Sequence, residues 1–261
     1  MSDAVLFHQE GHLGWITLNR PDARNCMTAE LLDGFLEASQ EAARSSARCI
    51  IVRGTGRCFS AGADLNIELQ REDDSRPMAP HERSYAMYKP FLSLLDIEVP
   101  VIGALNGHAV GGGFGLALTC DIRIANESAK YGANFARLGL HPGMAVSWFM
   151  PRLVGVSRAA ELLFTGRLIK GDEGARIGLF NQAVAGDAVI DAARALGEEI
   201  AASAPIAVRM MKRTFYEGLN WDPRSAARKE AWAQAATLDT EDAKEGVAAL
   251  LGKRPPVFRD R

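Results

Sequence analysis

A run of three glycines stands immediately before an apolar stretch and is the part of the sequence most suited to chemistry. Gly111, Gly112 and Gly113 precede residues 114–118, for which we predict a buried helix. Because glycine has no Cβ, a ligand can approach its backbone closely, and the first N–H groups of a helix have no partner within the helix. A second loop of small residues, at 60–63, follows another apolar run. Two such loops predict a site where backbone N–H groups stabilise a small negatively charged oxygen.

The glycine run also has other interpretations. Its structural interpretation is that glycine merely allows a buried helix to pack closely against its neighbours. Support for a dinucleotide-binding G-x-G-x-x-G pattern is weak, because Leu116 and Ala109 stand where patterns beginning at Gly111 and Gly107 need glycine. A phosphate-binding P-loop is excluded because the sequence has no lysine between Lys89 and Lys130.

Composition places the chain among ordinary globular proteins. It has 261 residues, of which 48% are hydrophobic and 24% charged, so disordered, collagen-like and disulfide-scaffold classes are excluded. The length predicts one or two domains. The net charge is -2 and there is no long run of one sign, so neither a nucleic acid nor a membrane surface is indicated as a partner.

Cysteine usage and the first residues indicate the compartment. The four cysteines form no C-x-x-C pair and do not cluster with the five histidines, so we predict no metal site and four buried thiols in a reducing environment: Cys26, Cys49, Cys58 and Cys120. The first residues show no basic segment followed by an apolar run, and no stretch of about 18 apolar residues occurs. We therefore expect a cytoplasmic protein.

The pattern along the chain predicts a mixed α/β fold. We expect a hairpin within residues 1–20, a helix capped by Thr28, a buried strand at 49–52, and a strand, glycine-rich turn, helix and strand over 99–125. The apolar helix at about 144–153 is interpreted as core, although its Trp148 is also a candidate for the wall of a pocket. Beyond about residue 187 the pattern is helical throughout, with Pro205 and Pro223 suited to first-turn positions. We predict two regions, 1–195 and 196–261.

Four motifs in order carry a resemblance to a known family. Residues 18–25, 58–65, 106–113 and 120–125 together resemble the enoyl-CoA hydratase/isomerase (crotonase) family, and the resemblance extends over essentially the whole chain. It implies a crotonase-type spiral of ββα units followed by a C-terminal helical trimerisation region. It also implies self-association as a trimer or a dimer of trimers.

The resemblance also implies a substrate. In this family an acyl-CoA thioester binds with its carbonyl oxygen between two backbone N–H groups, which fall here on Ala63 and Gly112. No separate cofactor is expected, because coenzyme A is part of the substrate. Arg24 and Lys253 are implied as coenzyme A contacts, with Lys253 reaching from a neighbouring subunit, although both residues fit equally well as solvated charges. The other implied substrate contacts are Ala61, Gly62, Ala63, Asp64, Leu65, Gly111 and Phe135; Asp64 also suits a helix cap.

The sequence departs from the family at the two proton-transfer positions. Family members that hydrate enoyl-CoA carry glutamates where this chain has Gly115 and Phe135. Since each acid–base group contributes about 100- to 10,000-fold, hydration should be slow, and isomerisation, decarboxylation or thioester hydrolysis becomes the expected reaction. His141 is the candidate acid or base, or else it caps a helix or packs beside Pro142. The rival hypothesis is a non-catalytic acyl-CoA binding protein, because the ring of Phe135 would fill the pocket.

Overall fold

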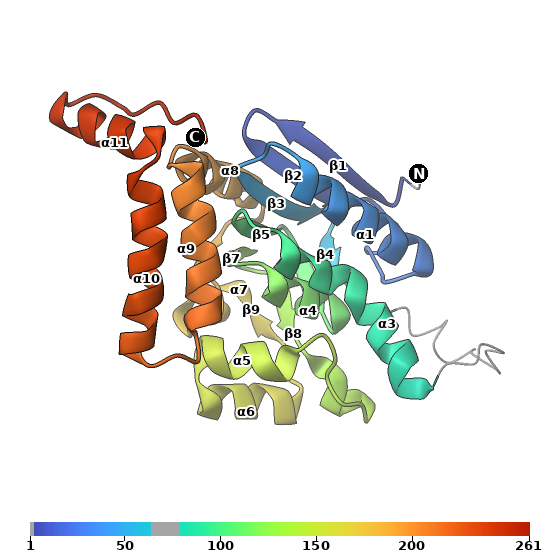
Figure 1. Cartoon of the computed structure of the whole chain (residues 1–261). Coiled ribbons are helices and arrows are strands. Elements are labelled where there is room, and N and C mark those ends of the chain that lie inside the picture. The colour runs from blue at the N-terminus through green and yellow to red at the C-terminus, as the bar shows by residue number, and fades with distance from the viewer. Residues whose placement is uncertain (1–2, 64–78) are drawn as a thin grey trace.

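The structure is a computed structural model that describes residues 3–63 and 79–261, and it places the strands in two sheets (Figure 1). The chain opens with the predicted hairpin, β1 (Val5–Glu10) and β2 (Leu13–Leu18), which pair antiparallel. Every other pairing in the larger sheet is parallel. In spatial order after β2 that sheet continues with β3 (Cys49–Gly54), β5 (Val101–Leu105), β7 (Ile122–Asn126) and β10 (Gln182–Val184).

The smaller sheet takes the strands in between. Its order is β4 (Cys58–Ser60), β6 (His108–Val110), β8 (Lys130–Gly132) and β9 (Ile169–Lys170). Successive strands therefore alternate between the sheets, β3 then β4, β5 then β6, β7 then β8, and each pair leads to a helix. Those helices are α3 (Pro80–Leu92), α4 (Gly112–Thr119) and the short 3-10 helix η2 (Asn134–Leu138). The repeat is a ββα unit.

Helices cover both faces of the larger sheet because its strands are apolar on both sides. One face packs against α1 (Ala29–Arg44), whose first turn is capped as predicted, since the Thr28 hydroxyl accepts a hydrogen bond from the Leu31 N–H. The opposite face carries Trp15, Ile51 and Ile102 and packs against α8 (Val189–Ala201). The core therefore fixes the ends of the strands, where the glycine loops emerge.

The C-terminal part of the described chain is helical, as predicted. The helices α9 (Pro205–Gly218) and α10 (Pro223–Leu238) lie side by side, and α11 (Glu241–Leu251) turns away from them (Figure 1). Both Pro205 and Pro223 occupy the first helical turn, where a missing N–H leaves no hydrogen bond unmade. The division at residues 195 and 196 stays a prediction; residue 195 falls within α8.

The final residues fold back on this helical region. Asp242, which is almost fully buried, accepts N–H hydrogen bonds from Arg259 and Asp260 at 2.7 and 2.9 Å. The carboxylate of Asp260 pairs with Arg209 on α9, and the carbonyl of Phe258 accepts from Arg48. This C-terminal clamp therefore joins α11 and α9 to the loop before β3.

Two further findings concern expectations from the sequence. Cys49, Cys58 and Cys120 are buried, but Cys26 is only half-buried, so the expectation of four buried thiols is wrong for Cys26; none of the four forms a disulfide. Within residues 3–63 and 79–261, no helix has the length and apolar character needed to cross a membrane.

Candidate active site

The two glycine loops meet, although they are far apart in the sequence. Gly62 has a φ of +82°, and a Cβ placed on it would lie 2.9 Å from the nitrogen of Gly112. Two backbone hydrogen bonds hold the first loop: the Ala61 N–H donates to the Arg24 carbonyl at 3.0 Å, and the Met27 N–H donates to the Gly62 carbonyl at 2.9 Å. Only glycine at position 62 permits both this backbone conformation and this close approach.

Two N–H groups at this junction have no acceptor among residues 3–63 and 79–261. Gly112 is the first residue of α4, so its N–H has no partner within the helix, and the cap residue Gly111 has no side chain to provide one. Across the described ranges 3–63 and 79–261, neither the Ala63 N–H nor the Gly112 N–H donates a hydrogen bond. The junction therefore places two unused donors beside the positive end of a buried helix.

Apolar side chains surround the first turn of α4. A Cβ on Gly112 would overlap the Met27 sulfur, and one on Gly111 would lie 3.8 Å from the Phe135 ring. A Cβ on Gly115 would lie 2.5 Å from the Met144 Cβ, which is closer than real atoms approach. Met144 therefore occupies the space that any side chain at position 115 would need.

The backbone at Met144 is strained. Met144 and Ala145 have φ angles of +59° and +54°, in the left-handed region that L-residues with a Cβ disfavour by about 1–2 kcal/mol each. The buried Met144 side chain packs into the core, whereas Ala145 is exposed and ends the loop before α5 (Val146–Val154). Strain of this kind persists only where the surrounding packing imposes it, and it often marks a functional loop.

A tyrosine packs against the same loop. Gly143 is buried, and a Cβ there would overlap the ring and hydroxyl of Tyr88 on α3. Gly143 does not have a positive φ, so its backbone conformation does not require glycine. Position 143 requires glycine because the Tyr88 side chain occupies the space that a Cβ would need. Tyr88 is half-buried, and its hydroxyl has no hydrogen-bond partner in the part of the chain that the structure describes.

His141 belongs to this loop but is exposed. Its Nδ1 lies 2.7 Å from the carbonyl oxygen of Pro142. A carbonyl only accepts, so in this contact Nδ1 carries the proton and Nε2 is left as an acceptor. The packing beside Pro142 matches the structural interpretation, and the acid–base role of His141 stays a prediction. His108 accepts a hydrogen bond from the Lys130 N–H and joins β6 to β8.

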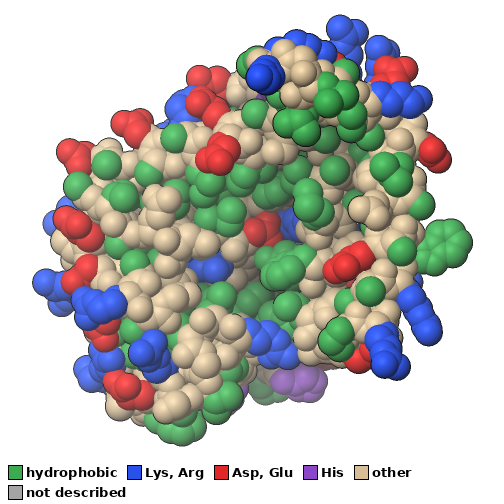
Figure 2. All heavy atoms as spheres, turned by 90° about the vertical axis from the view of Figure 1, so that its left-hand side faces the viewer, with side chains coloured by type: hydrophobic (Ala, Val, Ile, Leu, Met, Phe, Trp, Pro, Cys, Tyr) green, Lys and Arg blue, Asp and Glu red, His purple; other side chains and the backbone are tan. Residues whose placement is uncertain are grey.

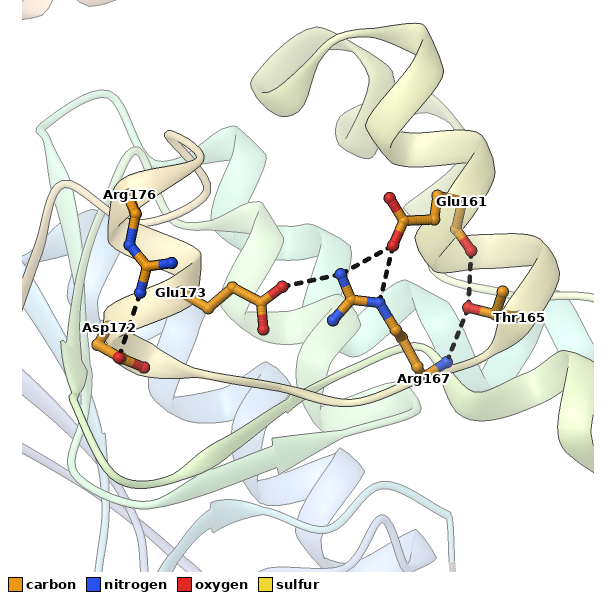
Figure 3. A network of polar contacts seen from close by, with 6 residues as sticks. All are labelled: Glu161, Thr165, Arg167, Asp172, Glu173 and Arg176. Carbon is orange, nitrogen blue, oxygen red and sulfur yellow. Dashed lines mark hydrogen bonds and ion pairs between the residues drawn. The ribbon is translucent and has the colours of Figure 1, made fainter.

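A polar network holds η2, which carries Phe135, beside Gly111. Arg137 on η2 donates to the carbonyl of Thr165 at 2.9 Å, at the end of α6 (Val156–Thr165). Arg167 follows that end and pairs with Glu161 at 2.9 Å and with Glu173 at 2.8 Å (Figure 3). Hydrogen bonds with these two carboxylates raise the pKa of Arg167, so its guanidinium stays charged. The network thus fixes the loop after α6, on which η2 rests.

The structure of the single chain does not bring the predicted coenzyme A contacts together at the junction of the glycine loops. Arg24 is exposed, with a φ of +53°, and only its carbonyl contacts the glycine loop, whereas Asp64 and Leu65 lie outside the described residues. Lys253 is exposed and follows α11, on the far side of the molecule from α3 (Figure 1). The coenzyme A contacts assigned to Arg24 and Lys253 stay predictions.

Other chemistries find no support near this site. Burial raises the pKa of Cys49 and of Cys120 to about 12, so both thiols are neutral near pH 7 and poor nucleophiles. Asp121 has a structural role, because its carboxylate accepts from the Val101 N–H, from Lys212 and from the Tyr216 hydroxyl. Among the described residues, no group of three or more His, Cys, Asp and Glu side chains could hold a metal ion.

A cavity of about 600 Å³ lies on the other side of α5, between that helix and α9. Ala145 and Trp148 line it, and Trp148 is 39% exposed, so the interpretation of the whole helix as core is wrong for this residue. Four of its charged residues form two ion pairs, Lys212 with Asp121 at 2.7 Å and Arg213 with Glu217 at 2.9 Å. On the face that carries the C-terminal helices, hydrophobic side chains gather around a hollow (Figure 2).

Comparison with known proteins identifies the family. The sequence matches the enoyl-CoA hydratase/isomerase family over residues 8–261. The chain belongs to this family. The short-chain-enoyl-CoA hydratase of Clostridium acetobutylicum is 34% identical to it over 252 residues, which are 96% of this chain and 95% of that protein. Human enoyl-CoA hydratase domain-containing protein 2, mitochondrial, is 37% identical over 93% of this chain and 84% of its own.

Solved structures agree with the family assignment. The crystal structure of enoyl-CoA hydratase from Bacillus anthracis superposes on this structure with a TM-score of 0.93. The two sequences are 31% identical, and the match covers 99% of this chain and 100% of the Bacillus anthracis chain. The predicted resemblance is confirmed. So is the fold class, a crotonase-type arrangement of ββα units with a C-terminal helical region. Family membership also makes acyl-CoA thioesters the substrate class to test.

The sequence pointed to the glycines of this site but missed three side chains around them. Met27, Tyr88 and Met144 are ordinary apolar or aromatic residues in the sequence, and each reaches the site from a different element. The glycines at 112, 115 and 143 were the available signal, because each lacks a Cβ where one of these side chains needs space.

Proposed function

We propose that this protein is an acyl-CoA-processing enzyme that stabilises a thioester enolate between the backbone N–H groups of Ala63 and Gly112. The observation that carries the proposal is the junction of the two glycine loops, where both N–H groups lack an acceptor among the described residues. An enolate oxygen gains more from fixed donors than the neutral thioester does, so such a site lowers the barrier to enolate formation. We further propose that the protein assembles as a trimer or a dimer of trimers.

We propose that standard enoyl-CoA hydration is slow in this enzyme. Hydration needs a group that holds and deprotonates the attacking water and a group that protonates the α-carbon. At the two positions where the family resemblance places glutamates, Gly115 offers no side chain and Phe135 offers a hydrocarbon ring. The contact between Gly115 and Met144 supports this view, since it leaves no room for a carboxylate at position 115.

The second candidate function is non-catalytic binding of acyl-CoA. The apolar side chains of Met27 beside Gly112 and Phe135 beside Gly111 favour it, because apolar surroundings suit retention of an acyl group without proton transfer. A panel of acyl-CoA thioesters monitored by mass spectrometry separates the candidates. Formation of any product supports the enzyme, whereas micromolar binding with no product from any thioester supports the binding protein.

The role of the Gly112 N–H is testable by proline substitution. Position 112 is the first residue of α4, where proline removes an N–H without removing a helical hydrogen bond. Because a Cβ at 112 would overlap the Met27 sulfur, we would make Gly112→Pro in a Met27→Ala background, with Met27→Ala alone as the control. We expect kcat/KM for the thioester that turns over to fall about 100- to 1,000-fold. Equal activity in the two variants, at equal melting temperature, would remove Gly112 from the mechanism.

A further inference from the structure

We propose that Met27 is an oxidation site that controls the junction of the glycine loops. A peroxide converts its thioether into a sulfoxide, and the sulfoxide oxygen accepts the hydrogen bond of the Gly112 N–H in place of the substrate oxygen. The inference rests on the proposed function, since it takes the Gly112 N–H as a donor to the substrate. It goes beyond that function by naming a modification and the class of oxidant that causes it.

Met27 contacts both glycine loops. Its backbone forms an isolated parallel bridge with Ala63, and its N–H donates to the Gly62 carbonyl at 2.9 Å. Its side chain reaches the other loop, because a Cβ on Gly112 would overlap the Met27 sulfur and would lie 3.3 Å from the Met27 methyl carbon. Met27 is therefore joined to one donor residue through its backbone and to the other through its sulfur.

The sulfur lies close to the Gly112 N–H. The backbone nitrogen of a residue is about 2.5 Å from the Cβ position of that residue, so a sulfur that would overlap a Cβ on Gly112 lies within about 5 Å of the Gly112 nitrogen. A sulfoxide oxygen extends one bond beyond the sulfur. Because the methionine side chain has three rotatable bonds, this oxygen can be brought to hydrogen-bond distance from the N–H.

Oxidation changes the sulfur from a weak acceptor into the bearer of a strong one. A thioether sulfur accepts hydrogen bonds poorly, so the reduced side chain leaves the N–H to the substrate. A sulfoxide is polar, and its oxygen carries a partial negative charge. The Gly112 N–H lies at the positive end of α4 and donates to no other group in the described ranges 3–63 and 79–261. It is therefore a ready partner for that oxygen.

Exposure makes Met27 accessible to a peroxide where a neighbouring methionine is protected. Met27 is half-buried, whereas Met144, which packs on Gly115 of the same helix, is only 1% exposed. A peroxide in water therefore reaches the sulfur of Met27 more readily than that of Met144. Met211 on α9 is 62% exposed, so it reports oxidation on a different element.

The step balances with the peroxide as the one co-reactant. Hydrogen peroxide transfers an oxygen atom to a lone pair of the Met27 sulfur: the O–O bond breaks, an S–O bond forms, and water leaves. The sulfur is oxidised by two electrons and the peroxide is reduced by two. Methionine sulfoxide reductases reverse the change, with a dithiol that becomes a disulfide as the reductant.

The test compares each protein with its own untreated form after exposure to hydrogen peroxide. Peptide mapping by mass spectrometry follows the oxygen gained at each methionine. As Met27 is oxidised, we expect kcat/KM of the wild type for the thioester that turns over to fall at least about tenfold. Treatment with methionine sulfoxide reductases should restore it.

Two variants make the effect specific to Met27. Met27→Leu has an apolar side chain of similar volume and should keep its own untreated kcat/KM after exposure to peroxide. Met211→Leu is the matched control and should lose activity as the wild type does, because it keeps Met27. An equal loss in Met27→Leu and in the wild type would overturn the inference.

Oxidation of Cys26 would have a different signature. Cys26 precedes Met27 and is half-buried, so a peroxide also reaches it. Dithiothreitol reduces a sulfenic acid or a disulfide but leaves a methionine sulfoxide in place. Recovery of activity with dithiothreitol alone, or protection in Cys26→Ser but not in Met27→Leu, would assign the effect to the cysteine and overturn the inference.

A measurement on the Gly112 amide separates this inference from the proposed function. In a proton–nitrogen correlation spectrum, the Gly112 signal should move downfield when the wild type is oxidised and stay in place when Met27→Leu is treated. An unmoved signal with Met27 fully oxidised would overturn the inference and leave the proposed enzyme standing. If no thioester turns over, the proposed enzyme fails, and the Gly112 signal still decides whether the sulfoxide takes this donor.

Discussion

At the scale of single residues, Gly115 and Met144 form a close-packed pair at a position where the family resemblance places a glutamate. The methionine side chain fills the volume beside the first turn of α4, and its left-handed backbone keeps it there. A carboxylate at position 115 therefore requires two changes, one to introduce it and one to make room for it.

This requirement leads to a prediction about gained hydration. Gly115→Glu alone should lower the free energy of unfolding by about 1–3 kcal/mol, because the new side chain overlaps Met144. Adding Met144→Ala should restore much of that stability, and adding Phe135→Glu should then supply the second carboxylate. We expect hydration of crotonyl-CoA to rise at least about 100-fold in the triple variant over the wild type, measured by loss of the enoyl absorbance.

One control variant and one stability measurement test this interpretation. Met144→Ala alone should leave hydration at the wild-type rate, because it adds no acid–base group. If Gly115→Glu is as stable as the wild type, Met144 does not occupy the space that we assign to it.

At the residue scale, the sequence predicted the close approach of the backbone at the two glycine loops. It did not predict the contacts between side chains that come from distant elements. The close approach at Gly62 and Gly112 follows from glycine's lack of a Cβ and was predicted as two converging loops. The contacts of Tyr88 and Met144 depend on how α3 and the 139–145 loop pack on α4, which no local pattern specifies. The contact of Phe135 with Gly111 was consistent with the resemblance, but the spacing of the residues did not predict it.

At the scale of elements, the loop between η2 and α5 stores strain close to the site. Two consecutive residues with a Cβ adopt left-handed conformations just before α5, at Met144 and Ala145. Met144 gains core packing in return, whereas exposed Ala145 has no comparable contact in its favour. The strain at Ala145 should therefore be removable.

We predict that Ala145→Gly raises the free energy of unfolding by about 0.5–1 kcal/mol. Glycine adopts a φ near +54° without steric cost, and this gain exceeds the entropy that glycine adds to the unfolded chain. Urea denaturation of the two proteins at one pH measures the difference. The matched control is Ala195→Gly on the exposed side of α8, which should lower stability by about 0.5–1 kcal/mol. A loss of equal size in Ala145→Gly would contradict the left-handed assignment.

The helices and strands with a clear sequence pattern of their own were predicted correctly. The hairpin, the Thr28 cap and the first-turn positions of Pro205 and Pro223 are confirmed, because each depends on the chemistry of a few adjacent residues. The helix expected from about residue 144 begins instead at Val146, since strain at the two preceding residues holds them outside it. Such strain comes from tertiary packing, so the hydrophobic periodicity of the sequence does not predict it.

At the scale of the whole molecule, the C-terminal helices expose an unusual amount of apolar surface. Several large side chains on α9, α10 and α11 are more than half exposed, and Trp232 is 79% exposed. Exposed apolar side chains that gather on one region of a protein typically mark a site of association. The exposed set is Met211, Phe215, Trp232, Leu238, Val247, Leu250 and Leu251.

We predict that Trp232→Glu weakens self-association. A charge within an apolar interface is desolvated without a partner, so the assembled form should lose stability relative to free chains. Light scattering after size exclusion should give three or six times the chain mass of 28.2 kDa for the wild type and a lower mass for the variant. Leu6→Glu, on β1, is the control and should keep the wild-type mass. A monomeric wild type at micromolar concentration would contradict the proposed assembly.

The C-terminal clamp has a practical consequence for anyone who expresses the protein. The carbonyl of Arg261 accepts the Asp242 N–H at 2.9 Å, and the Arg261 guanidinium pairs with Glu241 at 2.7 Å. We expect a purification tag joined directly after Arg261 to disturb the hydrogen bond and the ion pair by which Arg261 contacts α11. A tag placed ahead of the first residue leaves those contacts untouched, so the choice of vector decides whether the helical region is studied in its native arrangement.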